Sequence, residues 1–394
     1  MTAKPGDILI VGGGIIGLMS ARELLKQGAT VRILERHTTG RESSWAGGGI
    51  LSPLYPWRAP EPINRLFAWS HREYPVLMQE IQQNTGMDPE WNRSGLMVAE
   101  GTTEHASVEE WANTYGFTCD WLSGHQARSM EPAVNWQEWN PLRLPDIAQV
   151  RNPRLLAAIR QDVCQWGGQI IEQATVTRIR QEKRRITAVD AAGSTYTADT
   201  YVMATGAWSG LLESRLDKHS AGLPVEPVKG QMLVVKTAPG TLTHILLCNG
   251  KYLIPRRDGH ILVGSTLEYS GFDSSTTETA YQELLSFARH WLPDCPIQVE
   301  KHWAGLRPGS PQGIPYICRH PEIINLYLNC GHFRNGYVMA PASVRMLSSL
   351  ILKLPGFTDT DTYGLQSNPI PFTHDILKPP LPGQTEPDES CRTE

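Results

Sequence analysis

The segment that most constrains the fold is the glycine-rich hexapeptide GGGIIG at residues 12–17, which fits the pattern G-x-G-x-x-G. It follows a short apolar run at 7–11 that predicts a buried strand. Apolar residues then recur at helical spacing as far as Gly28, and a β-branched run at 30–35 predicts a second strand. This strand–turn–helix–strand order predicts a βαβ unit that binds a dinucleotide.

Each of the three glycines that define this pattern has a physical role. Gly12 permits the tight turn, Gly14 leaves room for a pyrophosphate, and Gly17 lets the helix pack closely on the strand. The helix N-terminus supplies free N–H groups and a partial positive charge for phosphates. Glu35, at the end of the second strand, can accept hydrogen bonds from a ribose 2′-OH and would repel a 2′-phosphate. NADP is therefore disfavoured.

The choice between NAD and FAD depends on segments much later in the chain. A predicted strand ends in Ala204-Thr205-Gly206, and a glycine-flanked turn at 331–336 precedes a predicted helix. A long cofactor needs such a second set of backbone contacts, so these segments favour FAD. An NAD-dependent dehydrogenase remains the more distant alternative.

Composition excludes several other classes of protein. The formal net charge of −4, with no run of basic residues, gives no sign of a nucleic-acid partner. The longest apolar stretch, 8–19, is glycine-rich and shorter than the ~20 residues of a membrane helix, so no transmembrane segment is expected. The N-terminus lacks the pattern of a signal peptide, and the 7 cysteines are scattered without a CxxC pair. We therefore expect a cytoplasmic protein with no metal site.

The 394 residues suggest two domains, and the order of the predicted elements suggests how they are arranged. Nucleotide-domain patterns occur at the start, middle and end, with an antiparallel pattern between them. The predicted fold class is α/β with α+β: a Rossmann-like FAD-binding domain interleaved with a substrate domain built on an antiparallel sheet. The elements of 86–145 cannot be placed. The predicted boundaries are 1–84, 146–222 and 322–365 for the FAD-binding domain, 85–145 and 223–321 for the substrate-binding domain, and 366–394 for a partly disordered tail.

Seven motifs in this order and spacing make the chain recognisable. They are VGGGIIG at 11–17, SSWAGGGI at 43–50, ATGAWS at 204–209, VKGQ at 228–231, YLIPR at 252–256, WAGLRP at 303–308 and GHFRNG at 331–336. With these motifs the chain resembles the D-amino acid oxidase superfamily of FAD-dependent proteins, and within it the glycine oxidases of the thiamine-biosynthesis type. The resemblance runs from about Asp7 to Leu352.

The resemblance implies a substrate site made of three residues, which would also be the catalytic ones. The arginine of WAGLRP, Arg307, would bind the substrate carboxylate, and the tyrosine of YLIPR, Tyr252, would also contact it. Arg334 of GHFRNG would lie at the substrate and the flavin. Some relatives carry a histidine at the position of Gly250, so the finer substrate preference is left open.

The resemblance also implies the cofactor contacts. FAD would be bound non-covalently, because Cys318 is offset from the position at which sarcosine oxidases attach their flavin. The expected cofactor-binding residues, from the fingerprint and the resemblance together, are Gly12, Gly14, Ile15, Ile16, Gly17, Glu35, Arg36, Ser43, Ser44, Gly48, Gly49, Ile50, Val176, Gly206, His332, Phe333, Arg334, Asn335, Gly336, Tyr337 and Val338.

Some of these residues can be interpreted without the family. A planar guanidinium binds a carboxylate through two parallel hydrogen bonds, which suits Arg307 at the end of a strand, and the alternative is a structural salt bridge. The helix that follows Gly336 would point its positive end at the flavin and stabilise a reduced ring. His332 is better interpreted as a hydrogen-bonded turn histidine than as a base. Residues 52–60, with Tyr55 and Trp57, form either a lid or an ordinary packed loop.

The predicted reaction is oxidative deamination of glycine and other small amines and amino acids, such as sarcosine and small D-amino acids. A hydride would pass from the substrate Cα to flavin N5, with the amine neutral and the carboxylate held. The imine would hydrolyse to a 2-oxo acid and ammonia, and dioxygen would reoxidise the flavin to give H2O2. Two alternatives remain: a D-amino acid dehydrogenase that passes electrons to a quinone, and a flavin-binding subunit without turnover. The oligomeric state, including a homo-oligomer, is left open.

Overall fold

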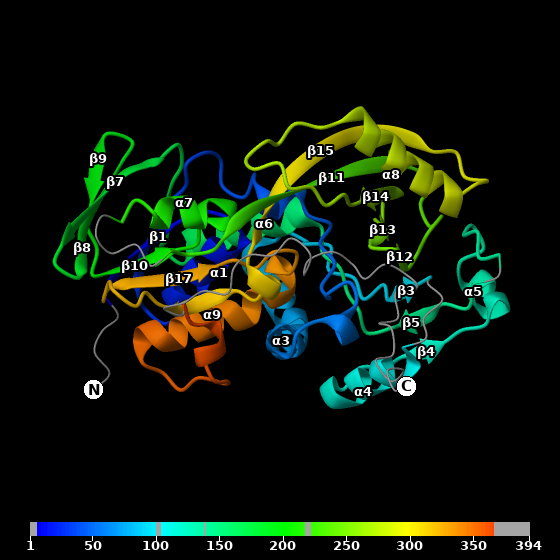
Figure 1. Cartoon of the computed structure of the whole chain (residues 1–394), viewed down its shortest axis with the longest axis horizontal. Coiled ribbons are helices and arrows are strands. Elements are labelled where there is room, and N and C mark those ends of the chain that lie inside the picture. The colour runs from blue at the N-terminus through cyan, green and yellow to red at the C-terminus, as the bar shows by residue number, and fades with distance from the viewer. Residues whose placement is uncertain (1–5, 100–103, 138, 217–221, 366–394) are drawn as a thin grey trace, which may run out of the picture.

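The computed structural model describes residues 6–99, 104–137, 139–216 and 222–365, and Figure 1 shows how their elements are arranged. The tail predicted at 366–394 lies outside the described residues. No helix in the four described ranges is both long and apolar enough to cross a membrane.

The first sheet contains six strands in the order β16-β17-β10-β1-β2-β6. All neighbours pair in parallel except the edge strand β16, which is antiparallel to β17. The glycine turn at 12–14 therefore leaves the carboxyl end of a central strand. The strands are β1 (Asp7–Val11), β2 (Thr30–Leu34), β6 (Gln169–Ile171), β10 (Thr200–Met203), β16 (Tyr316–Arg319) and β17 (Leu326–Cys330).

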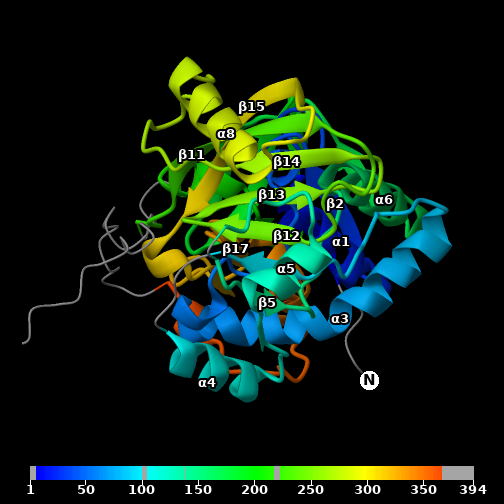
Figure 2. The ribbon, with the colours of Figure 1, turned by 90° about the vertical axis from the view of Figure 1, so that its right-hand side faces the viewer.

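The two faces of this sheet carry different layers, because alternate side chains of a strand point to opposite faces. Ile8 and Ile10 of β1 belong to a core to which several helices contribute, whereas Leu9 belongs to a core shared with a three-stranded sheet, β7-β8-β9. Figures 1 and 2 show the helices gathered on one side. The elements are α1 (Ile15–Lys26), α3 (Glu61–Thr85), α6 (Asn152–Gln165), α9 (Gly336–Leu352), β7 (Val176–Glu182), β8 (Arg185–Ala191) and β9 (Ser194–Tyr196).

The second sheet contains eight strands in the order β15-β11-β14-β13-β12-β3-β5-β4 and is antiparallel except for the β12–β3 pair. Helix α8 (Glu278–Trp291) covers one face, where Leu284 and Trp291 join a third core (Figures 1 and 2). The strands are β3 (Leu96–Val98), β4 (Asp120–Trp121), β5 (Leu142–Leu144), β11 (Glu226–Lys236), β12 (Ile245–Cys248), β13 (Lys251–Pro255), β14 (His260–Gly264) and β15 (Gln298–Gly309).

Shorter elements connect these layers. Two helices, α4 (His105–Tyr115) and α5 (Gly124–Met130), lie in the region whose elements the sequence does not place. The remaining short helices are α2 (Ser43–Ala46), α7 (Ser209–Glu213), η1 (Pro56–Arg58), η2 (Gly206–Trp208), η4 (Pro311–Gly313) and η5 (Asp361–Tyr363).

The predicted fold class is confirmed: a mixed α/β architecture in which two sheets draw their strands from interleaved segments of the chain. A hairpin turn at Asp258-Gly259 joins β13 to β14, with Gly259 at φ +84°. Helix α3 begins after Pro60 and ends before Gly86, which is in the left-handed conformation.

Candidate active site

A cavity of about 450 Å³ lies between the two sheets and takes lining residues from both. Its size falls within the ~300–1,000 Å³ of typical small-molecule sites. One part of its wall includes Gly12 and Glu35, at the carboxyl ends of β1 and β2. Another part includes Tyr252 and Arg307, from β13 and β15. The cavity therefore joins the predicted nucleotide site to the predicted substrate site.

The glycine turn has no room for side chains. Gly12 has φ +110°, and a Cβ there would lie 2.3 Å from the carbonyl oxygen of Ala204. A Cβ on Gly17 would lie 1.9 Å from the carbonyl oxygen of Gly12, so only glycine lets α1 start this close to the turn. Gly14 is the N-cap of α1, and it lines the cavity with Ile15 and presents no side chain there. The turn thus fits a pyrophosphate.

Glu35 is held in place at the end of β2. It is buried, and its two carboxylate oxygens accept hydrogen bonds from the backbone N–H groups of Gly13 (2.8 Å) and His37 (3.0 Å). Next to it, the Arg36 guanidinium stacks 3.4 Å from the ring centre of Trp208 and pairs with Glu42 at 2.5 Å. The carboxylate is therefore fixed at the cavity wall, where it can accept from ribose hydroxyls.

The turn after α2 forms another part of the wall. Asn152, at the start of α6, donates from its side-chain amide to the carbonyl oxygens of Ser44 (2.9 Å) and Gly47 (2.8 Å). The Ser44 carbonyl also accepts from the Tyr337 hydroxyl at 3.0 Å, and the Ser43 hydroxyl donates to the Leu306 carbonyl. These contacts tie the turn to helices α6 and α9 and to strand β15.

The turn before α9 places residues 331–336 along the cavity and aims the positive end of the helix at it. His332 lies in this turn, fully buried, with Nε2 at 3.0 Å from the Ser343 hydroxyl. Burial lowers the pKa of His332 to about 3, so the ring is neutral at ordinary pH. The interpretation of His332 as a hydrogen-bonded turn histidine is confirmed.

Arg307 reaches the cavity from β15. Its Nη1 donates to the carbonyl oxygens of Lys229 (3.2 Å) and Thr266 (3.3 Å), and its Nη2 donates to the Ser265 hydroxyl (2.7 Å). Burial lowers its pKa, and the electrostatic influence of the nearby Tyr252 and Glu268 opposes this effect. Among the described residues no carboxylate forms an ion pair with Arg307. The alternative of a structural salt bridge therefore finds no partner there.

Tyr252 and Arg334 complete this end of the cavity. The Tyr252 ring lies across Gly264, where a Cβ would come within 2.7 Å of Cε2. Burial and the neighbouring Arg307 lower the pKa of Arg334 to about 10. Two guanidinium groups that repel each other inside one cavity define a site for an anion, because a bound carboxylate relieves both the repulsion and the desolvation.

Most of the expected cofactor residues line the cavity, with two exceptions. Gly17 and Val338 lie outside its wall: Gly17 packs against Gly12, and Val338 is buried in the helical core. Residues that the sequence did not single out also contribute. One of them is Asn329 near the end of β17, which is fully buried and whose Oδ1 lacks a hydrogen-bond partner.

The segment 52–60 forms part of the wall and is also packed. Ser52 and Leu54 line the cavity, and the buried Tyr55 hydroxyl accepts a hydrogen bond from the backbone N–H of Gly250 at 2.8 Å. The Trp57 indole donates to Glu104 at 2.8 Å. In this conformation the segment closes the cavity as a packed loop.

A fixed acidic residue beyond a glycine turn, joined by one cavity to an anion site, defines a dinucleotide-dependent enzyme that acts on a small acid. The chain belongs to the DAO family of FAD-dependent oxidoreductases, whose family profile matches residues 7–350. FAD is thus its cofactor. The residues of the glycine turn, Glu35 and the turn before α9 line the cavity and are suited to bind FAD.

The chain is similar to proteins named glycine oxidase. The one from Pseudomonas aeruginosa is 42% identical over 87% of this chain and 94% of its own length. The one from Pseudomonas putida is 40% identical over 91% of this chain and 97% of its own length. The crystal structure of glycine oxidase from Geobacillus kaustophilus superposes with a TM-score of 0.85 at 29% identity, covering 92% of this chain and 99% of that one.

Proposed function

We propose that this protein catalyses the oxidative deamination of glycine and other small amines and amino acids, including sarcosine and small D-amino acids. The observation that carries the proposal is that Arg307 and Tyr252 line the same cavity as Glu35. The 42% identity to a glycine oxidase over most of both chains supports this substrate class.

The protein's own groups bind and orient the substrate. Arg307 and Tyr252 would hold its carboxylate, and Arg334 would add a second positive charge at the same end. Their fixed positions supply orientation and electrostatic stabilisation. Burial lowers the pKa of His332 to about 3, which makes its ring a poor proton acceptor, and its Nε2 is bonded to Ser343, so we do not assign it as the base. The substrate amine must therefore bind in its neutral form.

When bound, FAD supplies a hydride acceptor at N5 for the Cα hydrogen of the substrate. The imine product would hydrolyse to a 2-oxo acid and ammonia. Dioxygen would reoxidise the flavin and be reduced to H2O2, which completes the cycle. We propose non-covalent binding, since Cys318 lies in β16 within a core and outside the cavity wall. The domain boundaries and the cytoplasmic location remain predictions from the sequence, and the oligomeric state stays open.

A substrate panel with peroxide detection tests the proposal. Glycine, sarcosine, D-alanine and L-alanine are added to the purified yellow protein in air. We expect peroxide with the first three. Dye reduction without peroxide would indicate a dehydrogenase that uses another acceptor. A flavin that is not bleached by any of these compounds without oxygen would indicate a binding subunit without turnover.

A further inference from the structure

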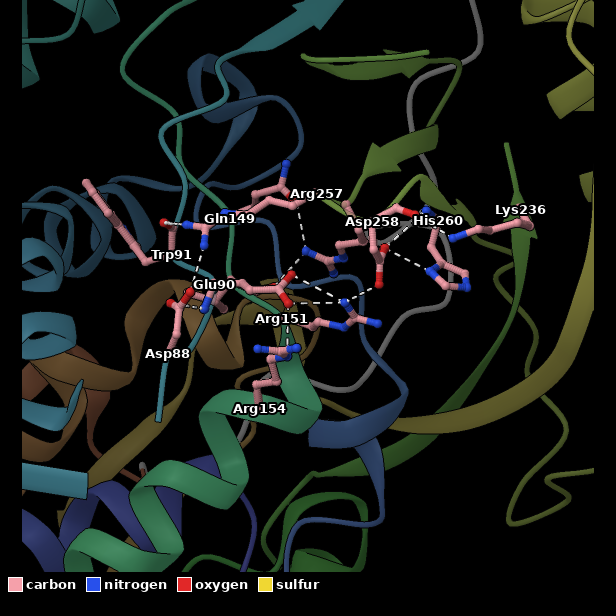
Figure 3. Close-up of polar contacts among 12 residues, drawn as sticks. Asp88, Glu90, Trp91, Gln149, Arg151, Arg154, Lys236, Arg257, Asp258 and His260 are labelled. Carbon is pink, nitrogen blue, oxygen red and sulfur yellow. Dashed lines mark hydrogen bonds and ion pairs between the residues drawn. The ribbon is translucent and has the colours of Figure 1, made fainter. Parts of the chain in front are cut away.

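A network of charged side chains joins three segments at the junction of the two sheets, as Figure 3 shows. The buried Glu90 accepts ion pairs from Arg151 (3.1 Å) and Arg154 (2.9 Å), which both lie at the start of α6. Arg151 also pairs with Asp258 at 2.7 Å, in the turn between β13 and β14. The hairpin that carries Tyr252 is thereby bound to the helix beside the cofactor cavity.

Two consecutive arginines follow β13 and have different environments. Arg257 is exposed, and it pairs with Asp88 at 2.7 Å and donates to the carbonyl of Trp91 at 3.2 Å. Arg256 is 8% exposed. Arg257 therefore belongs to the rim of the junction, whereas Arg256 lies inside it.

The Arg256 guanidinium makes three hydrogen bonds, all to neutral oxygens. Nη1 donates to Gln149 Oε1 (2.7 Å) and to the carbonyl of Val150 (2.9 Å), and Nη2 donates to the carbonyl of Gly48 (2.7 Å). Gly48 lines the cofactor cavity. A buried cation is costly unless it is hydrogen-bonded, so these oxygens and the surrounding carboxylates of Glu90 and Asp258 are needed to keep it there.

Gly48 is also pressed against β13 from another direction. A Cβ on Gly48 would lie 2.5 Å from Ile254 Cδ1 and 3.3 Å from Tyr252 Cε2. The next residue is fixed as well, because the Gly49 carbonyl accepts a hydrogen bond from the N–H of Val150 at 2.9 Å. The Gly47–Gly49 turn is thus held between β13, the chain before α6 and Arg256.

We propose that Arg256 is a positioning residue: its guanidinium fixes the Gly47–Gly49 turn of the cofactor site against the strand that carries Tyr252. It does not touch the cavity, so it acts through Gly48. The planar fork is required, because it spans the Gly48 carbonyl and the Gln149–Val150 pair at once. A lysine side chain has one nitrogen, so it can reach either the Gly48 carbonyl or the Gln149–Val150 pair but not both.

The test compares FAD retention in three variants of the holoenzyme. Arg256→Lys keeps the charge, Arg256→Met removes it, and Arg257→Met removes the neighbouring exposed ion pair as the matched control. For each we measure the temperature of flavin release by flavin fluorescence, the temperature of unfolding by far-ultraviolet circular dichroism, and the dissociation constant for FAD.

We expect both Arg256 variants to release flavin before they unfold and to bind FAD at least about tenfold more weakly, the loss of a charged hydrogen bond. Arg257→Met should match the wild type. If Arg256→Met does not fold, the FAD affinity of Arg256→Lys tests the proposal by itself. Wild-type FAD affinity in Arg256→Lys would overturn the proposal, and so would equal weakening in Arg257→Met or flavin loss that always coincides with unfolding.

Discussion

The guanidinium of Arg307 lies flat across Gly230 of the neighbouring strand, where a Cβ would come within 2.1 Å of Nη2 and 2.4 Å of Cζ. Strands β11 and β15 pair side by side here, with Gly230 opposite Gly305. The missing side chain makes the space in which Arg307 can lie and still reach Ser265. The position of the anion site is therefore set by a glycine as much as by the arginine.

Gly230→Ala should displace Arg307 and leave the cofactor end unchanged. Overpacking of this kind costs about 1–3 kcal/mol, and a loss of that size in transition-state binding would lower kcat/KM for glycine by about fivefold to 160-fold. Steady-state kinetics by peroxide release measures it, with FAD content as the internal check. The exposed Gly356, whose Cβ would meet only ordinary contacts, gives the control Gly356→Ala. Wild-type kinetics in Gly230→Ala would contradict the assigned geometry.

Arg307→Ala should abolish efficient turnover while FAD stays bound. Hydrogen bonds to charged groups contribute about 1.5–3 kcal/mol each, so losing two should lower kcat/KM by at least about 100-fold. Since its nearest partners are the Ser265 hydroxyl and two carbonyls, no ion pair of the described residues is broken by the change. The visible flavin spectrum and kinetics are compared with those of Arg257→Ala. Unchanged kinetics would mean that the carboxylate is held elsewhere.

The cofactor end of the site could be predicted from the sequence because its requirements are local. The tight turn at Gly12 and the close helix start at Gly17 are visible as glycines at fixed spacing after a strand. The order of the nucleotide-type segments likewise predicted interleaved domains, since parallel strands need long connections.

The packing between distant segments could not be predicted. A glycine inside a strand, such as Gly230 or Gly264, indicates a close approach but does not say by which side chain. The contact of Arg256 with Gly48 joins the end of β13 to the turn after α2, and nothing in the YLIPR motif identifies its partner. Strand β4 has two residues and β3 and β5 three each, too short for a periodic pattern, which is why 86–145 stayed unassigned.

Glu35→Gln should weaken FAD binding without unfolding the protein. The amide keeps one acceptor oxygen for the Gly13 N–H but loses the charge that strengthens hydrogen bonds from ribose hydroxyls. We expect the dissociation constant for FAD to rise about tenfold. Titration of the apoprotein with FAD, followed by flavin fluorescence, measures it. Glu182→Gln, on an exposed part of β7, is the control. An unchanged dissociation constant would show that Glu35 stabilises the glycine turn and does not bind FAD.

His332 should make the stability of the protein fall in acid. Its pKa is about 3 in the fold, because burial disfavours the charged ring, and about 6.5 in the unfolded chain. Between these values the unfolded chain binds a proton that the folded protein does not. Stability is therefore intact above pH 6.5 and is lost as the pH falls toward 3, by up to about 1.4 kcal/mol per pH unit from this residue.

His332→Asn isolates this contribution, because asparagine keeps a polar group near Ser343 and does not titrate in this range. Other groups titrate equally in both proteins, so the difference between them reports His332 alone. From pH 7 to pH 5 the wild type should lose about 2 kcal/mol more unfolding free energy than the variant. Urea unfolding with saturating FAD at both pH values measures it, and the exposed His125→Asn should behave as the wild type. Equal losses in the wild type and His332→Asn would mean that the ring takes up its proton in the fold, which would restore it as a candidate base.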